Sequence, residues 1–209
     1  MFVNHRGEIF IVDDDPVARV GLCGVFAQAG YQVTSFIDGE TFVVAARKRT
    51  PSCIILDLYM PSRSGLEVLR DIDASNYPAP IFIASGRGDI PTAVAAIKYG
   101  AFDFFEKRLD PSELVERVRQ ALIVCQQRQH RGYGSDAPLS SFPGSELLTK
   151  REREVLAQIA ASATNKEAAR NLGISTRTVE IHRAHIMDKL GAKNSVDLAS
   201  KVLASRRSA

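Results

Sequence analysis

The first half of the sequence contains short apolar runs, and two of them end in aspartate. Residues 9–12 lead into Asp13 and Asp14, and residues 53–56 lead into Asp57. Such short, nearly all-apolar runs, each followed by helix signals, are typical of strands buried on both faces of a parallel sheet. Because ligands of open α/β sheets bind beyond the carboxyl ends of the strands, we expect these three carboxylates to meet there.

Three acids at one sheet edge repel one another unless a cation neutralises them. Oxygen ligands of this kind suit Mg²⁺, which keeps several waters and often bridges to a phosphoryl group. Two more polar residues follow such strand-like runs: Ser85 follows the apolar run 81–84, and Lys107 follows residues 102–106, which are rich in phenylalanine. A hydroxyl and an ammonium group beside the acids provide binding for phosphoryl oxygens. The pattern therefore predicts an aspartyl-phosphate site in which Asp57 is the covalent nucleophile.

Strand and helix patterns alternate along the first part of the chain. Strands are expected near residues 8–12, 31–35, 53–57, 80–84 and 101–105. Helices are expected near residues 16–29, 39–48, 65–73, 89–99 and 111–125. Five such units predict an α/β domain over residues 1–125, with a parallel sheet, helices on both faces and right-handed crossovers. A stretch rich in Gly, Pro and Ser predicts a flexible linker over residues 126–145.

Residues 146–209 have a purely helical pattern and predict a four-helix domain. Residues with N-cap chemistry precede the first three helices: Thr149, with Glu152 completing a capping box, then Thr164 or Asn165, then Ser175. A fourth helix is expected from about 195 to 205. The second and third helices, joined by residues 172–175, form a helix-turn-helix.

The net charge of +3 is distributed unevenly along the chain. It is −3 over residues 1–125, +1 over 126–145 and +5 over 146–209. A basic C-terminal domain beside an acidic one favours binding to nucleic acid. No apolar run approaches the length of a membrane span, and no secretory pattern precedes the first strand. With three cysteines that lack metal-ligand spacing, these features predict a cytoplasmic protein that does not enter membranes.

Residues 6–125 resemble the receiver domain of two-component response regulators. The resemblance rests on four short motifs: Val12-Asp13-Asp14, Leu56-Asp57-Leu58-Tyr59-Met60-Pro61, Ala84-Ser85-Gly86 and Glu106-Lys107. Residues 147–204 resemble the LuxR-type helix-turn-helix, on the segments 148–156, 165–167 and 172–180. With both parts, the chain is identified as a member of the NarL/FixJ family. This resemblance implies a doubly wound sheet of order 2-1-3-4-5 and a regulator of transcription rather than an enzyme.

The receiver resemblance implies a role for each residue of the predicted site. Asp57 is the phosphoacceptor, and a sensor histidine kinase is the donor. The other assignments are Mg²⁺ binding by Asp13, Asp14, Asp57 and the backbone carbonyl of Tyr59, acyl-phosphate binding by Lys107, and switching by Ser85 and Phe104. Phosphorylation is then expected to favour a homodimer that reads paired half-sites on double-stranded DNA. The resemblance also admits contact with RNA polymerase.

The third helix of the basic domain is the expected recognition helix. By their positions in the motif, the candidates for contact with base edges are Thr178, Glu180, Ile181 and Ala184. The candidates for phosphate contacts, which position the domain without reading sequence, are Lys166, Arg177 and Arg183.

Three residues depart from the family pattern. Arg108 follows Lys107 where receivers have a proline after a cis bond, so we expect either a trans loop or a cis bond that costs about 2.5–4 kcal/mol. Ser162 replaces a glycine that ends a helix, and Ala168 replaces a larger aliphatic residue. Arg108 keeps open a phosphorylation-independent regulator with an atypical receiver. A Mg²⁺-dependent phosphatase of the haloacid dehalogenase type is disfavoured, because Tyr59 occupies the place of its second aspartate.

Overall fold

The computed structural model describes residues 6–86, 90–108, 110–130, 144–194, 197–198 and 201, and the side chains of all of these except 128–130. The chain divides into two compact units, Met1–Leu122 and Ile123–Ala209. The helices within the described ranges include none that is long and apolar enough to cross a membrane.

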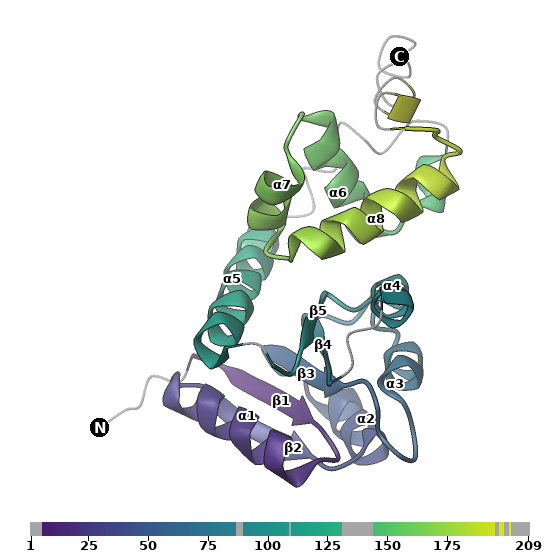
Figure 1. Ribbon diagram of the computed structural model, residues 1–209. Helices are drawn as coiled ribbons and strands as arrows, with labels where there is room; N and C mark the ends of the chain where they lie inside the picture. The colour runs from purple at the N-terminus through teal and green to yellow at the C-terminus, as the bar shows by residue number, and fades with distance from the viewer. Residues whose placement is uncertain are drawn as a thin grey trace. The chain divides into compact units, whose positions relative to one another are not determined.

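The first unit contains the predicted five-stranded parallel sheet (Figure 1). Its strands are β1 (Glu8–Val12), β2 (Gln32–Phe36), β3 (Cys53–Asp57), β4 (Ile81–Ser85) and β5 (Asp103–Glu106). The strand order is β2-β1-β3-β4-β5, which confirms the order implied by the family resemblance. Val12 pairs with Leu56, and Asp57 pairs with Ala84, so the last residues of the three central strands lie at one edge.

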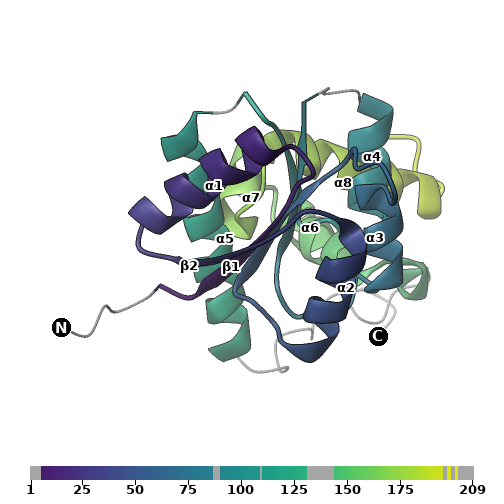
Figure 2. The same cartoon turned by 90° about the horizontal axis from the view of Figure 1, so that it is seen from below.

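Five helices cover the two faces of this sheet. They are α1 (Pro16–Gln28), α2 (Gly39–Lys48), α3 (Gly65–Asp71), α4 (Ile90–Lys98) and α5 (Pro111–His130). Figure 2 shows α1 and the first part of α5 on one face, and α2, α3 and α4 on the other. The fifth helix continues through residues 126–130, the start of the predicted linker. Residues 131–143 of that linker lie outside the described ranges.

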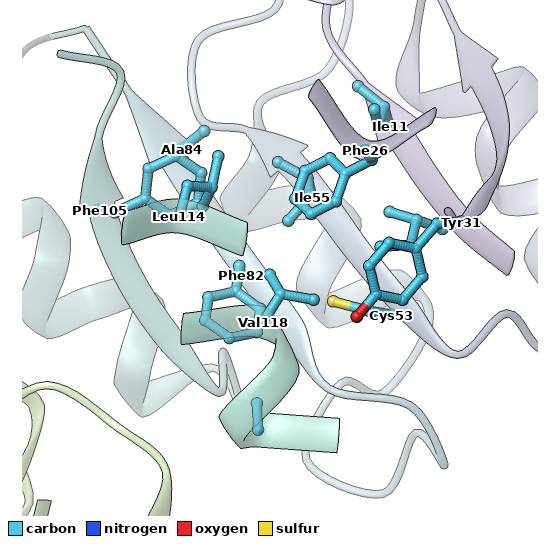
Figure 3. Close-up of a cluster of buried hydrophobic side chains, with 12 residues drawn as sticks. Ile11, Phe26, Tyr31, Cys53, Ile55, Phe82, Ala84, Phe105, Leu114 and Val118 are labelled. Carbon is cyan, nitrogen blue, oxygen red and sulfur yellow. The ribbon is translucent and has the colours of Figure 1, made fainter. Parts of the chain in front are cut away.

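The face under α1 and α5 holds one continuous hydrophobic cluster (Figure 3). Alternate strand residues such as Ile11, Ile55 and Phe82 point toward this face, as strand geometry requires. They pack against Phe26 of α1 and Val118 of α5, all of them almost fully buried. Burial of each such side chain contributes about 1.5–3 kcal/mol, so this cluster fixes the strands whose ends carry the acids.

The second unit contains the helix-turn-helix. Its described elements are a 3₁₀ turn, η2 (Ser145–Leu147), and the helices α6 (Lys150–Ala160), α7 (Asn165–Leu172) and α8 (Thr176–Lys189). Both predicted types of cap are present: capping boxes start α6 and α7, at Thr149 and Thr164, and Ser175 caps α8. Gly173 adopts a left-handed conformation, φ 67°, which lets the chain turn from α7 into α8. The fourth helix expected at residues 195–205 lies mostly outside the described residues.

The turn after α6 contains a left-handed residue that is not a glycine. Ser162 adopts a left-handed conformation, φ 61°, and its N–H donates to the carbonyl of Ile159 at 2.9 Å. A non-glycine residue in this conformation costs about 1–2 kcal/mol. Ala168, the other departure in this unit, is buried at 1% exposure.

Candidate functional site

The three acids meet beyond the carboxyl edge of the sheet, as the strand pattern predicts. One carboxylate oxygen from each of Asp13, Asp14 and Asp57 lies within 4.8 Å of the other two. Asp13 is 1% exposed and Asp57 is 3% exposed. Two carboxylates buried this deeply require cationic partners, because an isolated buried charge is strongly unfavourable.

Lys107 supplies a cation to both buried acids. Its Nζ lies 2.8 Å from Asp13 Oδ2 and 2.9 Å from Asp57 Oδ1. The backbone N–H of Lys107 donates to the carbonyl of Ser85 at 2.8 Å, which ties the loop after β5 to the end of β4. Lys107 therefore reaches the acids from a backbone position fixed by the neighbouring strand.

Burial and pairing act in opposite directions on these groups. Burial raises the pKa of Asp57, and the hydrogen bond and charge of Lys107 oppose that shift without cancelling it. Burial by itself lowers the pKa of Lys107, but hydrogen bonds to Asp13 and Asp57 outweigh it, so the pKa of Lys107 is raised. The ammonium stays protonated and remains available to bind an anionic group on Asp57.

Arg108 does not displace Lys107 from the site. Within the described residues there is no cis peptide bond, so the Lys107–Arg108 bond is trans. Of the two alternatives that the sequence left open, the structure adopts the trans loop. Both ion pairs of Lys107 are nevertheless formed.

The other predicted residues of the receiver site differ in how far they are buried. Ser85 is fully buried at the end of β4, and it pairs in register with Glu106 of β5. Phe104 is partly buried on β5, and its backbone N–H donates to Asp103 Oδ1 at 2.9 Å. The side chain of Tyr59 is exposed, at 48%, beside the β3–α3 loop.

Gly65 is a residue of this site that sequence reasoning missed. Its N–H donates to the carbonyl of Leu58 at 2.9 Å. A Cβ at this position would lie 2.4 Å from the carbonyl oxygen of Asp57, so only glycine fits. Its position directly after the α3 N-cap Ser64 is a weak signal, since many helices begin with glycine.

The donor set fits a hard divalent cation. The cluster offers three carboxylates and no sulfur or imidazole ligand among the described residues, which is the chemistry that Mg²⁺ prefers. Asp13, Asp14 and Asp57 are therefore the side chains that would hold the ion.

The predicted recognition helix, α8, presents one exposed face. Arg177, Glu180 and Ala184 are exposed on it and recur at helical spacing, and Lys166 is exposed on α7. Two of the residues predicted to contact bases are buried, Thr178 at 1% exposure and Ile181 at 7%, and their contact with bases stays a prediction. Both lie on the inward stripe of α8, and the hydroxyl of Thr178 is hydrogen-bonded to Ser175 Oγ at 2.8 Å.

Asn165 connects two of the residues predicted to contact DNA, Arg183 and Glu180. Arg183 Nη1 donates to Asn165 Oδ1 at 2.9 Å. The amide of Asn165 in turn faces Glu180 Oε1 at 3.5 Å. Arg183 and Glu180 are thus held side by side on the outer face of α8, where α7 begins.

His182 is a buried histidine behind the recognition face. It is 3% exposed, and neither ring nitrogen has a hydrogen-bond partner among the described residues. Burial lowers its pKa to about 3, and the charges of Arg151, His185 and Lys189 add to this shift while Glu152 opposes it. The folded unit therefore holds His182 neutral, as a core residue rather than a ligand.

This burial predicts that acid destabilises the second unit. An unfolded histidine titrates near 6.5, so stability is lost as the pH falls below 6.5 and the loss levels off near the folded pKa of about 3. When the pH is lowered from 7 to 5, wild type should therefore lose about 2 kcal/mol more unfolding free energy than His182→Leu. Urea unfolding of the full chain measures this, with His185→Leu as the control. Parallel pH profiles for His182→Leu and wild type would contradict it.

Comparison with known proteins matches both units to described families. Residues 9–119 match the model of the response regulator receiver domain, and residues 146–202 match that of bacterial regulatory proteins of the luxR family. The transcriptional regulatory protein FixJ of Bradyrhizobium diazoefficiens is 34% identical over 92% of this chain and 93% of its own length. The response regulator protein TodT of Pseudomonas putida is 38% identical over 91% of this chain and 82% of its own.

Solved structures agree with these sequence matches. A crystal structure of full-length FixJ from B. japonicum covers 98% of this chain and 99% of its own, with a TM-score of 0.58 and 31% identity. A structure of the response regulator StyR covers 93% of this chain and 97% of its own, with a TM-score of 0.53 and 33% identity.

Proposed function

The chain belongs to the NarL/FixJ family of response regulators, with a receiver domain and a LuxR-type DNA-binding domain, and we propose that Asp57 is the residue through which phosphorylation controls it. As in its FixJ-like relatives, the function is phosphorylation-controlled regulation of transcription. The observation that carries the assignment of Asp57 is its buried carboxylate, which shares the Lys107 ammonium with Asp13.

The proposed reaction is transfer of a phosphoryl group from a phosphohistidine of a sensor kinase. An oxygen of Asp57 attacks the phosphorus, the P–N bond breaks, and its electron pair returns to the imidazole nitrogen. Lys107 binds an oxygen of the transferred group. Mg²⁺, when bound by Asp13, Asp14, Asp57 and the carbonyl of Tyr59, neutralises the negative charge that gathers there.

The switch is proposed to run from the phosphoryl group to the protein surface. Ser85, at the end of β4, would turn its hydroxyl toward the phosphoryl oxygens. Phe104, on the adjacent strand β5 and only partly buried, would change position in response. Any preference for a homodimer must then come from contacts that differ between the two states.

The test of this site is phosphorylation of the full chain by a small-molecule phosphodonor. Intact mass should show a phosphate adduct in the presence of Mg²⁺ and little or none in excess chelator. Without the cation, the negative charge of the three carboxylates would repel the phosphoryl group. Equal adduct formation in chelator would overturn the metal-assisted site. An absence of adduct under both conditions would favour the phosphorylation-independent regulator.

DNA binding is proposed for the exposed face of α8 and the start of α7. Replacing Lys166 or Arg177 by alanine should weaken binding to all sequences alike and lower the slope of log K against log salt by about one, since each removes one phosphate contact. Lys150→Ala on α6 serves as the matched control and should leave the slope unchanged. Fluorescence anisotropy at several salt concentrations measures the slope, and a slope unchanged in Lys166→Ala and Arg177→Ala would remove both residues from the interface.

Glu180 and Ala184 are the exposed candidates for base contacts. Glu180 can accept a hydrogen bond from a cytosine amino group. A change at either residue should alter which sequence is preferred, while the salt slope stays the same. Selection of bound sequences from a random DNA pool by wild type and by Glu180→Ala distinguishes this role from phosphate contact.

A further inference from the structure

Arg19 contacts the loop that carries two of the three acids. It lies on the second turn of α1, and its Nη1 donates to the backbone carbonyl of Asp13 at 2.7 Å and of Asp14 at 3.3 Å. The side chain is partly buried. In the described part of the chain no ion pair joins Arg19 to a carboxylate. Its guanidinium contacts the backbone carbonyls of Asp13 and Asp14 instead.

The rest of this loop is fixed by its own residues. The N–H of Asp13 donates to the carbonyl of Phe36 at 3.1 Å, which holds the loop against β2. The N–H of Asp15 donates to Asp13 Oδ1 at 3.0 Å. Asp15 Oδ1 accepts from the N–H of Val17 at 2.9 Å and caps α1. The carbonyls of Asp13 and Asp14 lie between these fixed ends, and Arg19 supplies a donor to both.

We propose that Arg19 is a positioning residue for the cation site: it holds the Asp13–Asp14 loop so that both carboxylates converge with Asp57 before the cation binds. This inference rests on the proposed Mg²⁺ site. Replacing a residue that hydrogen-bonds to metal ligands and orients them commonly weakens metal binding by about 10–100-fold. The same range is expected here, because without Arg19 the cation itself would have to order the loop.

The sign of the effect separates positioning from simple charge. As a charge alone, the guanidinium of Arg19 repels a cation, so its removal would strengthen Mg²⁺ binding. As a positioning residue it preorganises the ligands, so its removal weakens binding. The two explanations predict opposite changes for the same variant.

The experiment is calorimetric titration of Mg²⁺ into the metal-free full chain. Arg19→Met should bind Mg²⁺ about 10–100-fold more weakly than wild type. Arg19→Lys, which keeps N–H donors, should recover part of that loss. Arg119→Met is the matched control: it removes an arginine from an exposed pair with Glu116 on α5 and should leave the affinity unchanged.

A second readout is the phosphodonor reaction measured across Mg²⁺ concentrations. In Arg19→Met the Mg²⁺ concentration for half the maximal rate should rise by a similar factor, while the rate at saturating Mg²⁺ changes much less. A residue needed only for folding would not produce this split. If Arg19→Met does not fold, Arg19→Leu, which also lacks both the charge and the N–H donors, replaces it in both measurements.

Two results would overturn the inference, and only the second would also reject the proposed cation site. Mg²⁺ binding by the charge-free variant that is as tight as wild type, or tighter, rejects positioning by Arg19 and leaves the cation site standing. A wild-type chain without saturable Mg²⁺ binding rejects both the inference and the proposed metal site.

Discussion

Asp57→Ala is expected to abolish formation of the phosphate adduct. The acyl phosphate requires a carboxylate oxygen as nucleophile, and alanine offers none. The measurement is intact mass after incubation with phosphodonor and Mg²⁺.

Asp71→Ala is the matched control for this variant. Asp71 is an exposed aspartate at the end of α3, in a surface pair with Arg63, and its removal should leave adduct formation unchanged. Persistence of the adduct in Asp57→Ala, with peptide mapping that places it on another residue, would refute the assignment of the phosphoacceptor.

Lys107→Met is expected to destabilise the receiver strongly. The substitution leaves Asp13 and Asp57 buried and facing each other without a cation, and removing one partner of a buried pair costs about 3–5 kcal/mol. Because Mg²⁺ neutralises the same acids, a concentration of 100 times its Kd should restore about 2.7 kcal/mol. Urea unfolding with and without Mg²⁺ measures both effects.

Lys98→Met provides the comparison for that loss. Lys98 is exposed in the last turn of α4, so its replacement should change the unfolding free energy by no more than about 0.5 kcal/mol. A Lys107→Met chain as stable as Lys98→Met in the absence of Mg²⁺ would show that the ammonium does not neutralise the cluster.

The sequence predicted the central strands of the sheet well because they are buried on both faces. Runs such as 53–56 are apolar throughout and are followed by an aspartate, so their ends are marked by a change of side-chain chemistry as well as by hydrophobicity. The edge strand β5 was predicted at 101–105 and forms at Asp103–Glu106. An edge strand pairs on one side only, so fewer hydrogen bonds fix its limits.

The acids of the site were also predictable, since parallel strands bring their carboxyl ends together. Contacts made by backbone atoms were not. Arg19 acts on carbonyl groups, and Gly65 fits because a Cβ would meet the carbonyl of Asp57. Neither contact leaves a motif of complementary side chains in the sequence. On α8, motif position placed Thr178 and Ile181 toward DNA but did not reveal that both side chains are buried.

Phosphorylation of Asp57 is proposed to control DNA binding. The most direct test of this claim is titration of a DNA site, selected from a random pool by the phosphorylated chain, with wild type and with Asp57→Ala, both in phosphodonor and Mg²⁺. Wild type should bind more tightly and as two copies on paired half-sites, because a second contact surface raises the effective concentration of the second domain. Equal affinity and equal stoichiometry for the two proteins would contradict the claim and favour a regulator that binds DNA without phosphorylation.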